Sequence, residues 1–297
     1  MRTLLTKTLH LIFGFVIMRS FSISAQDAIL WRIYGNGIRD TSWIYGTIHL
    51  RDKRVFIYAD TVLSYLDLCD KLVLELDLNP LYLLQYSGLI MLPEDSTLHD
   101  VFKPDDLAVI IEQVENITGM DFSTFEKLKP VVLLSLVIQH QMRGDMSFTL
   151  DEFLYQKGVE KGKEIVGLET FEEQFRLLET IPLEMIADYL KNPMEDEKEL
   201  ELMICDYLTS DIDELLLIMQ KDETMVTLKK EFLDDRNRKM AERTVKVLHD
   251  GVTLIAVGAG HLPGENGIIN LLRQGGYVVE PVILEASEDL KCQNPSL

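Results

Sequence analysis

Short apolar segments recur along the chain between longer segments of mixed polarity, and they predict strands. Five of them are compact: 28–34, 42–47, 71–76, 163–168 and 252–257. The last is almost wholly apolar and rich in β-branched residues, which is typical of a strand that is covered on both faces. The connection between the first two, GNGIRDT, has turn residues at hairpin spacing, so these two strands should form an antiparallel hairpin.

The longer segments have helical periodicity and fall into two blocks, residues 80–160 and 183–250. The last helix of the first block carries Asp151 in its first turn, where an acid suits the helix dipole. A further helix at about 265–274 stops at two glycines, and a final strand follows. The chain is thus expected to be a single α/β domain over residues 26–297, a central mixed β-sheet with two large helical insertions.

Two of the predicted strands end in the same pattern, Gly-x-x-His, which predicts a shared site. The first copy is Gly46-Thr-Ile-His49, and the second is Gly258-Ala-Gly-His261, which has a further glycine at Gly260. Glycine permits sharp turns, and ligands of open α/β sheets bind outside the carboxyl ends of the strands. The two histidines are far apart in the sequence, but similar positions at the edge of one sheet would bring them together.

Acidic residues stand at the ends of two other strands. Glu75 lies within the apolar run 72–78, where an unpaired carboxylate is costly, and Asp77 would point to the same face. A position at the strand end that reaches solvent is the alternative for Glu75. Glu169 follows the strand 163–168 and precedes a predicted helix, so it is either a site residue or only an acid near a helix start.

Five segments, taken in order, resemble the TraB/GumN family, which includes the Tiki proteins. They are YGTIHL at 45–50, LVLELDL at 72–78, GLETFEEQ at 167–174, DDRNRKMAER at 234–243 and the long segment 257–282. The resemblance implies an α/β fold distantly similar to erythromycin esterase, with both Gly-x-x-His motifs and acidic residues at its centre. Tiki members are described as divalent-metal-dependent proteases, so the resemblance also implies a hydrolytic site.

The fourth of these segments, by itself, predicts an exposed polar helix. The resemblance assigns Arg236 and Asn237 to a Glu-Arg-Asn-like motif of the family, with Asp235 where the family more often has glutamate. A fixed arginine at this position could pair with Glu75 or Glu169, or it could bind a substrate carboxylate or an oxyanion.

These residues together predict a metal-dependent hydrolase of an amide or ester, and the resemblance implies a peptidase in particular. His49, His261 and Glu75 would bind Mn, Co or Zn, because imidazole nitrogens and carboxylate oxygens suit these ions. The metal would lower the pKa of a bound water, which a glutamate would deprotonate as general base. The residues assigned to catalysis are Glu75, Glu169, Arg236 and Asn237.

Two other functions remain open. A metal-free hydrolase could use a histidine as base and a glutamate to orient it, as the similarity to erythromycin esterase implies. A non-catalytic periplasmic protein could hold a metal, haem or another ligand in the same pocket.

Two common hydrolase motifs are missing from the sequence. The chain has neither the HExxH motif of zinc metalloproteases nor the G-x-S-x-G elbow of serine hydrolases. The turn 258–264 is similar to the glycine-rich motif that binds dinucleotides. Its third glycine is one residue late, however, and only one strand follows, so the sequence argues against dinucleotide binding.

The first 25 residues predict a signal peptide rather than part of the fold. Arg2 and Lys7 form a basic segment, an apolar core spans 9–18, and Ile23-Ser-Ala25 offers a cleavage site. The apolar core is too short for an ordinary membrane span, and an uncleaved anchor is the alternative. We therefore expect an exported protein, with the periplasm as its compartment.

Net charge narrows the expected partners. The chain carries 29 basic and 49 acidic residues, a formal charge of −20, and loss of three basic residues with the signal peptide makes it −23. Such a surface repels nucleic acid and anionic membranes, which leaves a peptide or a small molecule as the substrate. The cysteines Cys69, Cys205 and Cys292 show no zinc motif or disulfide framework. One disulfide and one free thiol would fit, with Cys69 in the core.

Overall fold

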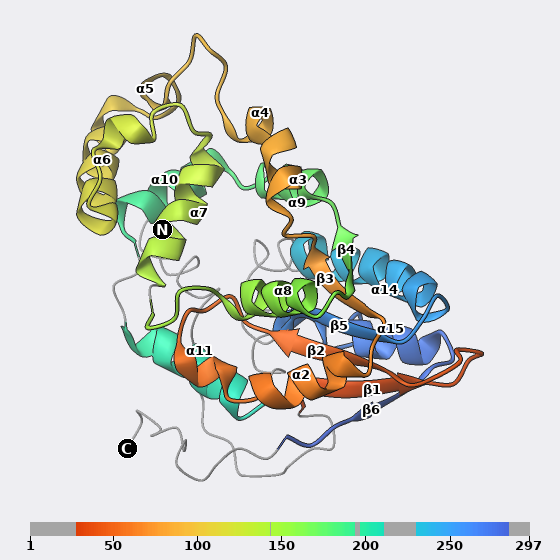
Figure 1. The fold of residues 1–297 in the computed structure, drawn as a ribbon. Coiled ribbons are helices and arrows are strands. Elements are labelled where there is room, and N and C mark those ends of the chain that lie inside the picture. Colours follow the sequence, from red (N-terminus) through yellow and green to blue (C-terminus); the bar gives the residue numbers. More distant parts are fainter. Residues whose placement is uncertain (1–27, 143, 194–196, 211–229, 285–297) are drawn as a thin grey trace. The chain divides into compact units, whose positions relative to one another are not determined.

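The computed structural model describes residues 28–142, 144–193, 197–210 and 230–284, and these form two compact units (Figure 1). The sheet unit comprises the described parts of 14–78, 144–170 and 198–297, and the helical unit comprises the described parts of 79–143 and 171–197. The predicted signal peptide and Cys292 lie outside the described residues.

The sheet unit is built on a six-stranded sheet in the order β4-β3-β5-β2-β1-β6. Its strands are β1 (Leu30–Tyr34), β2 (Ser42–Thr47), β3 (Lys71–Leu76), β4 (Glu164–Glu169), β5 (Thr253–Gly258) and β6 (Val278–Pro281). Strands β4, β3, β5 and β2 are parallel to one another, whereas β1 pairs antiparallel with both β2 and β6. The predicted α/β fold with a central mixed sheet is therefore confirmed.

The first two strands form the predicted hairpin, with Leu30 opposite Tyr45. Gly35, Asn36 and Gly37 in its turn have φ angles of 83°, 45° and 81°. These left-handed conformations favour glycine and asparagine, which explains why the connection has these residues.

Helices pack on this sheet because its central strands are apolar on both faces. In β5, for example, Leu254, Ile255, Ala256 and Val257 are all fully buried. Helix α8 contacts β3 and β4, α2 contacts β5, and α14 contacts β4, β5 and α15. The helical segments of the unit are η1 (Lys53–Phe56), α2 (Ala59–Asp67), α8 (Leu150–Glu160), α11 (Glu197–Leu208), the π-helix η3 (Lys230–Asp234), α14 (Asp235–Leu248), η4 (Ala259–His261) and α15 (Ile268–Gln274).

The helical unit has a hydrophobic core of its own. Leu98, Ile110, Leu133 and Leu190 are fully buried in this core. Its helices are α3 (Pro80–Gln85), α4 (Ser87–Ile90), α5 (Leu98–Val101), α6 (Pro104–Thr118), η2 (Phe122–Thr124), α7 (Pro130–Gln141), α9 (Phe171–Leu178) and α10 (Leu183–Lys191). Both long helices, α6 and α7, start with proline, whose fixed φ suits the first helical position.

The two helical insertions divide between the units at different points from those that the periodicity indicated. Helix α8, at the end of the first predicted block, packs in the sheet unit, and so do α11 and α14 of the second block. Helix α9 instead belongs to the helical unit. Periodicity identifies a helix but not the surface that it covers, so these assignments needed the structure. The single domain over residues 26–297 stays a prediction.

Two further expectations concern single features of the chain. Cys69 is a free thiol in the core, as predicted, and burial raises its pKa to about 12. Cys205 is disulfide-bonded. Within the described part of the chain, no helix has both the length and the apolar composition needed to cross a membrane.

Candidate active site

The parallel strands bring the predicted site residues to one edge of the sheet. Strands β2 and β5 are neighbours, with Thr47 level with Gly258, so the ends that lead to the two histidines lie side by side. Strand β3 follows on the other side of β5, and β4 pairs with β3 so that Leu76 is level with Glu169. The carboxyl ends of four adjacent strands therefore carry His49, His261, Glu75 and Glu169.

The first glycine of each Gly-x-x-His pattern is required by space rather than by backbone conformation. None of the three glycines, Gly46, Gly258 and Gly260, has a positive φ. The φ of Gly258 is −51°, which any residue can adopt. A Cβ atom on Gly46 would lie 2.9 Å from Leu262 Cδ1, and one on Gly258 would lie 3.0 Å from Glu75 Oε1. A Cβ on Gly260 would meet nothing within 4 Å, so glycine is not needed there. The sharp-turn role predicted for these glycines is thus replaced by close packing at two of them.

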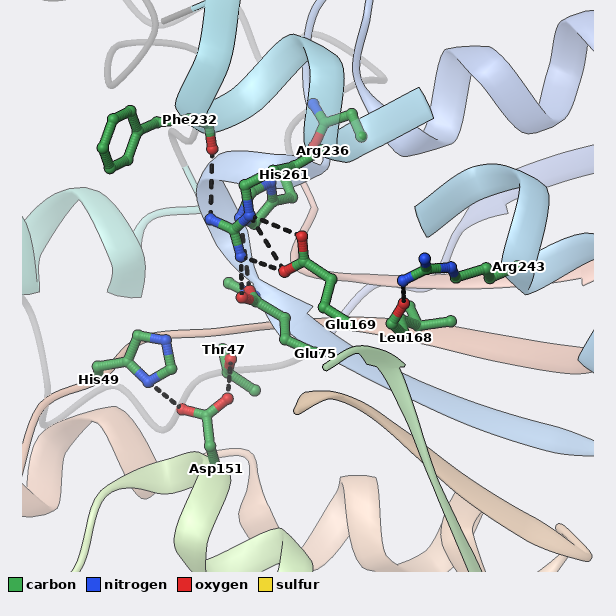
Figure 2. Close-up of polar contacts among 12 residues, drawn as sticks. Thr47, His49, Glu75, Asp151, Leu168, Glu169, Phe232, Arg236, Arg243 and His261 are labelled. Carbon is green, nitrogen blue, oxygen red and sulfur yellow. Dashed lines mark hydrogen bonds and ion pairs between the residues drawn. The ribbon is translucent and has the colours of Figure 1, made fainter. Parts of the chain in front are cut away.

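Arg236 bridges the two buried glutamates at the centre of the site (Figure 2). Its Nη2 donates to Glu75 Oε2 at 2.8 Å and to Glu169 Oε2 at 2.6 Å, and its Nε donates to Glu169 Oε1 at 3.0 Å. The side chains of Arg236, Glu75 and Glu169 are 17%, 10% and 3% exposed, so all three charges are removed from water. The sequence suggested that Arg236 pairs with one of these glutamates, and it pairs with both.

The backbone and a second arginine fix this cluster in place. Arg236 lies in the first turn of α14, directly after the π-helix η3, and its Nη1 donates to the carbonyl oxygen of Phe232 at 3.3 Å. Arg243, two turns further along α14, donates from Nη1 to the carbonyl oxygen of Leu168 at 2.5 Å. Helix α14 therefore holds the end of strand β4 at Leu168, directly before Glu169, whose carboxylate faces Arg236. Sequence analysis did not identify Arg243, although its spacing from Arg236 places it on the same helix face.

Asp235, by contrast, lies at the surface of the protein. Its carboxylate pairs with Lys230 Nζ at 2.9 Å and with Arg238 Nη1 at 2.6 Å, and the side chain is 38% exposed. The departure from the family's usual glutamate therefore leaves the Glu75–Arg236–Glu169 cluster unchanged.

His261 is buried, and its tautomer follows from its hydrogen bonds. Asn237 Nδ2 donates to the carbonyl oxygen of Asn266 at 2.9 Å, so Asn237 Oδ1 is the acceptor that faces His261 Nδ1 at 2.6 Å. The proton is thus on Nδ1, and Nε2 carries a lone pair that faces Glu75 Oε1 at 3.5 Å. Burial lowers the pKa of His261 to about 4, which keeps the ring neutral.

The neighbouring Glu75 carboxyl is ionised. Burial raises its pKa, but the charges of Arg236 and His49 and the Gly258 N–H, which donates to Oε1 at 2.6 Å, lower it more. Two atoms with lone pairs, His261 Nε2 and Glu75 Oε1, therefore face each other without a hydrogen bond between them. This pair of atoms can accept two hydrogen bonds from one water molecule, or it can bind a cation.

His49 has a different environment, two residues beyond the end of β2. Its side chain is 64% exposed, and its Nδ1 lies 2.9 Å from Oδ2 of Asp151. The Asp151 carboxylate raises the pKa of His49 above its ordinary value. Asp151 itself is only 8% exposed, and its Oδ1 accepts a hydrogen bond from the Thr47 hydroxyl at 2.6 Å.

Asp151 is a site residue that the sequence analysis missed, because an acid in a first helical turn indicates a dipole effect. In α8 it lies instead on the buried face, which also includes Leu150, Leu154 and Gly158. An acid on the apolar face of a helix was the signal that could have identified it.

The donor set does not form the predicted three-ligand metal centre. His49 contacts Asp151, and no dashed line in Figure 2 joins His49 to His261, Glu75, Glu169 or Arg236, although the charges of Glu75 and Arg236 act on its pKa. Both glutamates already accept hydrogen bonds from Arg236. Among the described residues, no three histidine, cysteine, aspartate or glutamate side chains are arranged to hold a metal ion.

Comparison with known proteins gives a family and several distant relatives. The model of the TraB/PrgY/gumN family matches residues 29–281. A protein of the sponge Amphimedon queenslandica named "Metalloprotease TIKI homolog" is 24% identical, over 86% of this chain and 62% of its own length. "Metalloprotease TIKI2" of Xenopus tropicalis is 23% identical, over 86% of this chain and 60% of its own length. An uncharacterised protein of Treponema pallidum is 21% identical, over 85% of this chain and 82% of its own length.

The match to the metalloproteases is partial, because the chain spans only about three fifths of their length. No solved structure matches the chain significantly.

Proposed function

Because the chain belongs to the TraB/PrgY/gumN family, we propose that it is a hydrolase that cleaves an amide or ester bond, with a peptide as the preferred substrate. The observation that carries the proposal is the contrast within the site. An exposed histidine with a raised pKa, His49, lies at the same sheet edge as a buried neutral histidine that faces an ionised glutamate. Such a separation of pKa values between neighbouring groups supports an acid and a base for one reaction.

The proposed mechanism uses the two lone pairs of the buried group to orient the attacking water. The water would donate one hydrogen bond to His261 Nε2 and the other to Glu75 Oε1, which are 3.5 Å apart. Its oxygen forms the new bond to the substrate carbonyl carbon while this pair takes one proton from the water. His49, protonated because of Asp151, gives its proton to the leaving nitrogen or oxygen as the bond to carbon breaks.

Arg236 supports this arrangement through the two glutamates. Its Nε and Nη2 donate to Glu75 and Glu169, and its Nη1 donates to the Phe232 carbonyl. We therefore propose that Arg236 keeps Glu75 ionised and fixed, rather than binding an oxyanion. Asn237 would act on His261 by keeping its proton on Nδ1.

The test is a screen of peptides and esters with purified residues 26–297. We expect hydrolysis by the wild type and a loss of about 100-fold or more in His49→Ala, since general acid–base groups contribute about 10²–10⁴-fold. His99→Ala is the matched control, because His99 is also half-exposed, at 52%, but lies in the helical unit. Equal rates for the wild type and His49→Ala, or no hydrolysis at all, would contradict the proposal.

A metal-dependent peptidase is the second candidate, and the names of the metalloprotease relatives favour it. His261 Nε2 and Glu75 Oε1 would be two ligands, since two donors each about 2.1 Å from one tetrahedral ion are about 3.4 Å apart. A bound Mn, Co or Zn ion would supply a Lewis acid that polarises the substrate carbonyl.

Thermal unfolding with added Mn, Co or Zn separates the two candidates. If these two side chains bind a metal, the ion should raise the Tm of the wild type and of His49→Ala, but not of His261→Ala or Glu75→Gln. Loss of the shift in His49→Ala as well would restore His49 as a ligand. Metal or haem binding without hydrolysis in the screen would support the non-catalytic alternative.

We also propose that the protein is exported to the periplasm, on the strength of residues 1–25. Expression of the full chain followed by N-terminal sequencing should find a mature protein that begins at Gln26. An intact Met1 in the periplasmic fraction would instead indicate an uncleaved anchor.

A further inference from the structure

The burial of Asp151 has no explanation within its own helix. Helix α8 is capped by Thr149 and Glu152: Glu152 Oε2 accepts from the Thr149 backbone N–H at 2.7 Å, and Thr149 Oγ1 accepts from the Glu152 N–H at 3.4 Å. The cap is therefore complete without Asp151. A carboxylate on a side chain that is only 11% exposed would be costly at this position unless its partners outside the helix compensate for the loss of water.

Both partners of Asp151 come from one Gly-x-x-His segment. Oδ1 accepts from the hydroxyl of Thr47, and Oδ2 lies 2.9 Å from Nδ1 of His49. Among the described residues, Oδ2 has no partner that satisfies hydrogen-bond geometry, so its contact with His49 is a close approach of two polar atoms. Both of these polar contacts of the carboxylate are therefore with the segment that leads to and includes the histidine.

The backbone of the same segment is held from a second helix. Tyr207 of α11 donates from its hydroxyl to the carbonyl oxygen of Gly46 at 3.0 Å, and the Tyr45 hydroxyl lies 2.7 Å from that of Tyr207. Both tyrosines are buried. The strand end that leads to His49 is therefore fixed at Gly46, and Asp151 is the group that contacts the exposed His49 ring itself.

We propose that Asp151 is a positioning residue that holds the His49 ring with Nδ1–H directed inward and Nε2 presented to the substrate. This inference rests on the proposed function of His49, but it concerns the ring's tautomer and orientation rather than the reaction itself. An inward Nδ1–H would leave Nε2 as the atom that exchanges a proton with the substrate.

The experiment measures the tautomer of His49 by ¹⁵N NMR at a pH at which the ring is neutral, together with hydrolysis. The wild type should show the Nδ1–H tautomer at His49. Asp151→Ala should shift His49 to the Nε2–H tautomer that a solvated ring prefers, and should lower kcat by about 10-fold or more with little change in KM. Asp145→Ala is the control, because this acid lies in the same stretch of chain but pairs with Lys53.

Asp151→Leu keeps the approximate shape of the side chain but has no acceptor for Nδ1–H, and it provides the second variant if the alanine variant does not fold. An unchanged His49 tautomer in a folded Asp151 variant would overturn the inference, whatever the activity. Changed tautomers in a protein that hydrolyses nothing would support the positioning role and contradict only the proposed hydrolase.

Discussion

The strand ends of β2 and β5 carry the same four-residue pattern in opposite environments. At β5, His261 is 5% exposed, donates to an asparagine and faces a glutamate. At β2, the His49 side chain is 64% exposed and faces a buried aspartate. The motif therefore determines where each histidine lies on the sheet, whereas the residues that contact the histidine in the folded protein determine its protonation. Three predictions test how far this contrast holds.

The largest expected effect comes from removal of the cation beside His261. Arg236→Met would remove the cation that pairs with the buried carboxylates of Glu75 and Glu169, which should cost about 3–5 kcal/mol of unfolding free energy. Urea unfolding at neutral pH measures this loss.

The control for Arg236 is its neighbour Arg238, which is 49% exposed and pairs with Asp235 at the surface. Arg238→Met should cost less than about 1 kcal/mol. Similar losses in the two variants would show that the buried half of the site is not an electrostatic cluster in solution.

The glycines provide an intermediate effect that compares the two motifs directly. Gly46→Ala and Gly258→Ala should each cost about 1–3 kcal/mol, because a Cβ would press on Leu262 in the first case and on Glu75 in the second. Gly260→Ala should stay within about 0.5 kcal/mol, since its Cβ meets nothing. Thermal or urea unfolding of the three variants decides this, and a loss at Gly260 as large as at Gly46 would disprove the spatial explanation.

The smallest effect is a difference in pH dependence between the histidines. The pKa of His261 is lowered from 6.5 to about 4, so the unfolded chain binds more protons and stability should fall as the pH drops from 6.5 towards 4. The pKa of His49 is raised, so its contribution is fully present below pH 6.5 and is lost as the pH rises through the folded value. Solvent screens the His49 contribution, because the ring is mostly exposed.

Unfolding free energies measured from pH 4 to 9 would separate the two contributions. His261→Ala should remove the slope on the acidic side, and His49→Ala should remove the weaker slope on the basic side. If both variants flatten the same side of the curve, the two histidines have the same environment and the contrast is wrong.

The sequence by itself determined the strands and the residues at their ends. The runs 71–76 and 252–257 are mainly apolar, as strands covered on both faces require, and they form the central strands β3 and β5. Because four of the strands are parallel neighbours, Glu75, Glu169 and His261 reach one edge, as their positions at the strand ends indicated. Arg236 could be assigned to the same place only through the family resemblance.

Only the tertiary structure decided which of these groups pair with one another. Local sequence carries no information on contacts between residues far apart in the chain, such as that of Asp151 with Thr47 and His49, about 100 positions earlier. It assigned Asp151 to a helix dipole, because the pattern cannot say which helix face becomes buried or against what. The same limit explains why α8 was grouped with the first helical block, and why His49 and His261, alike in sequence, differ in protonation.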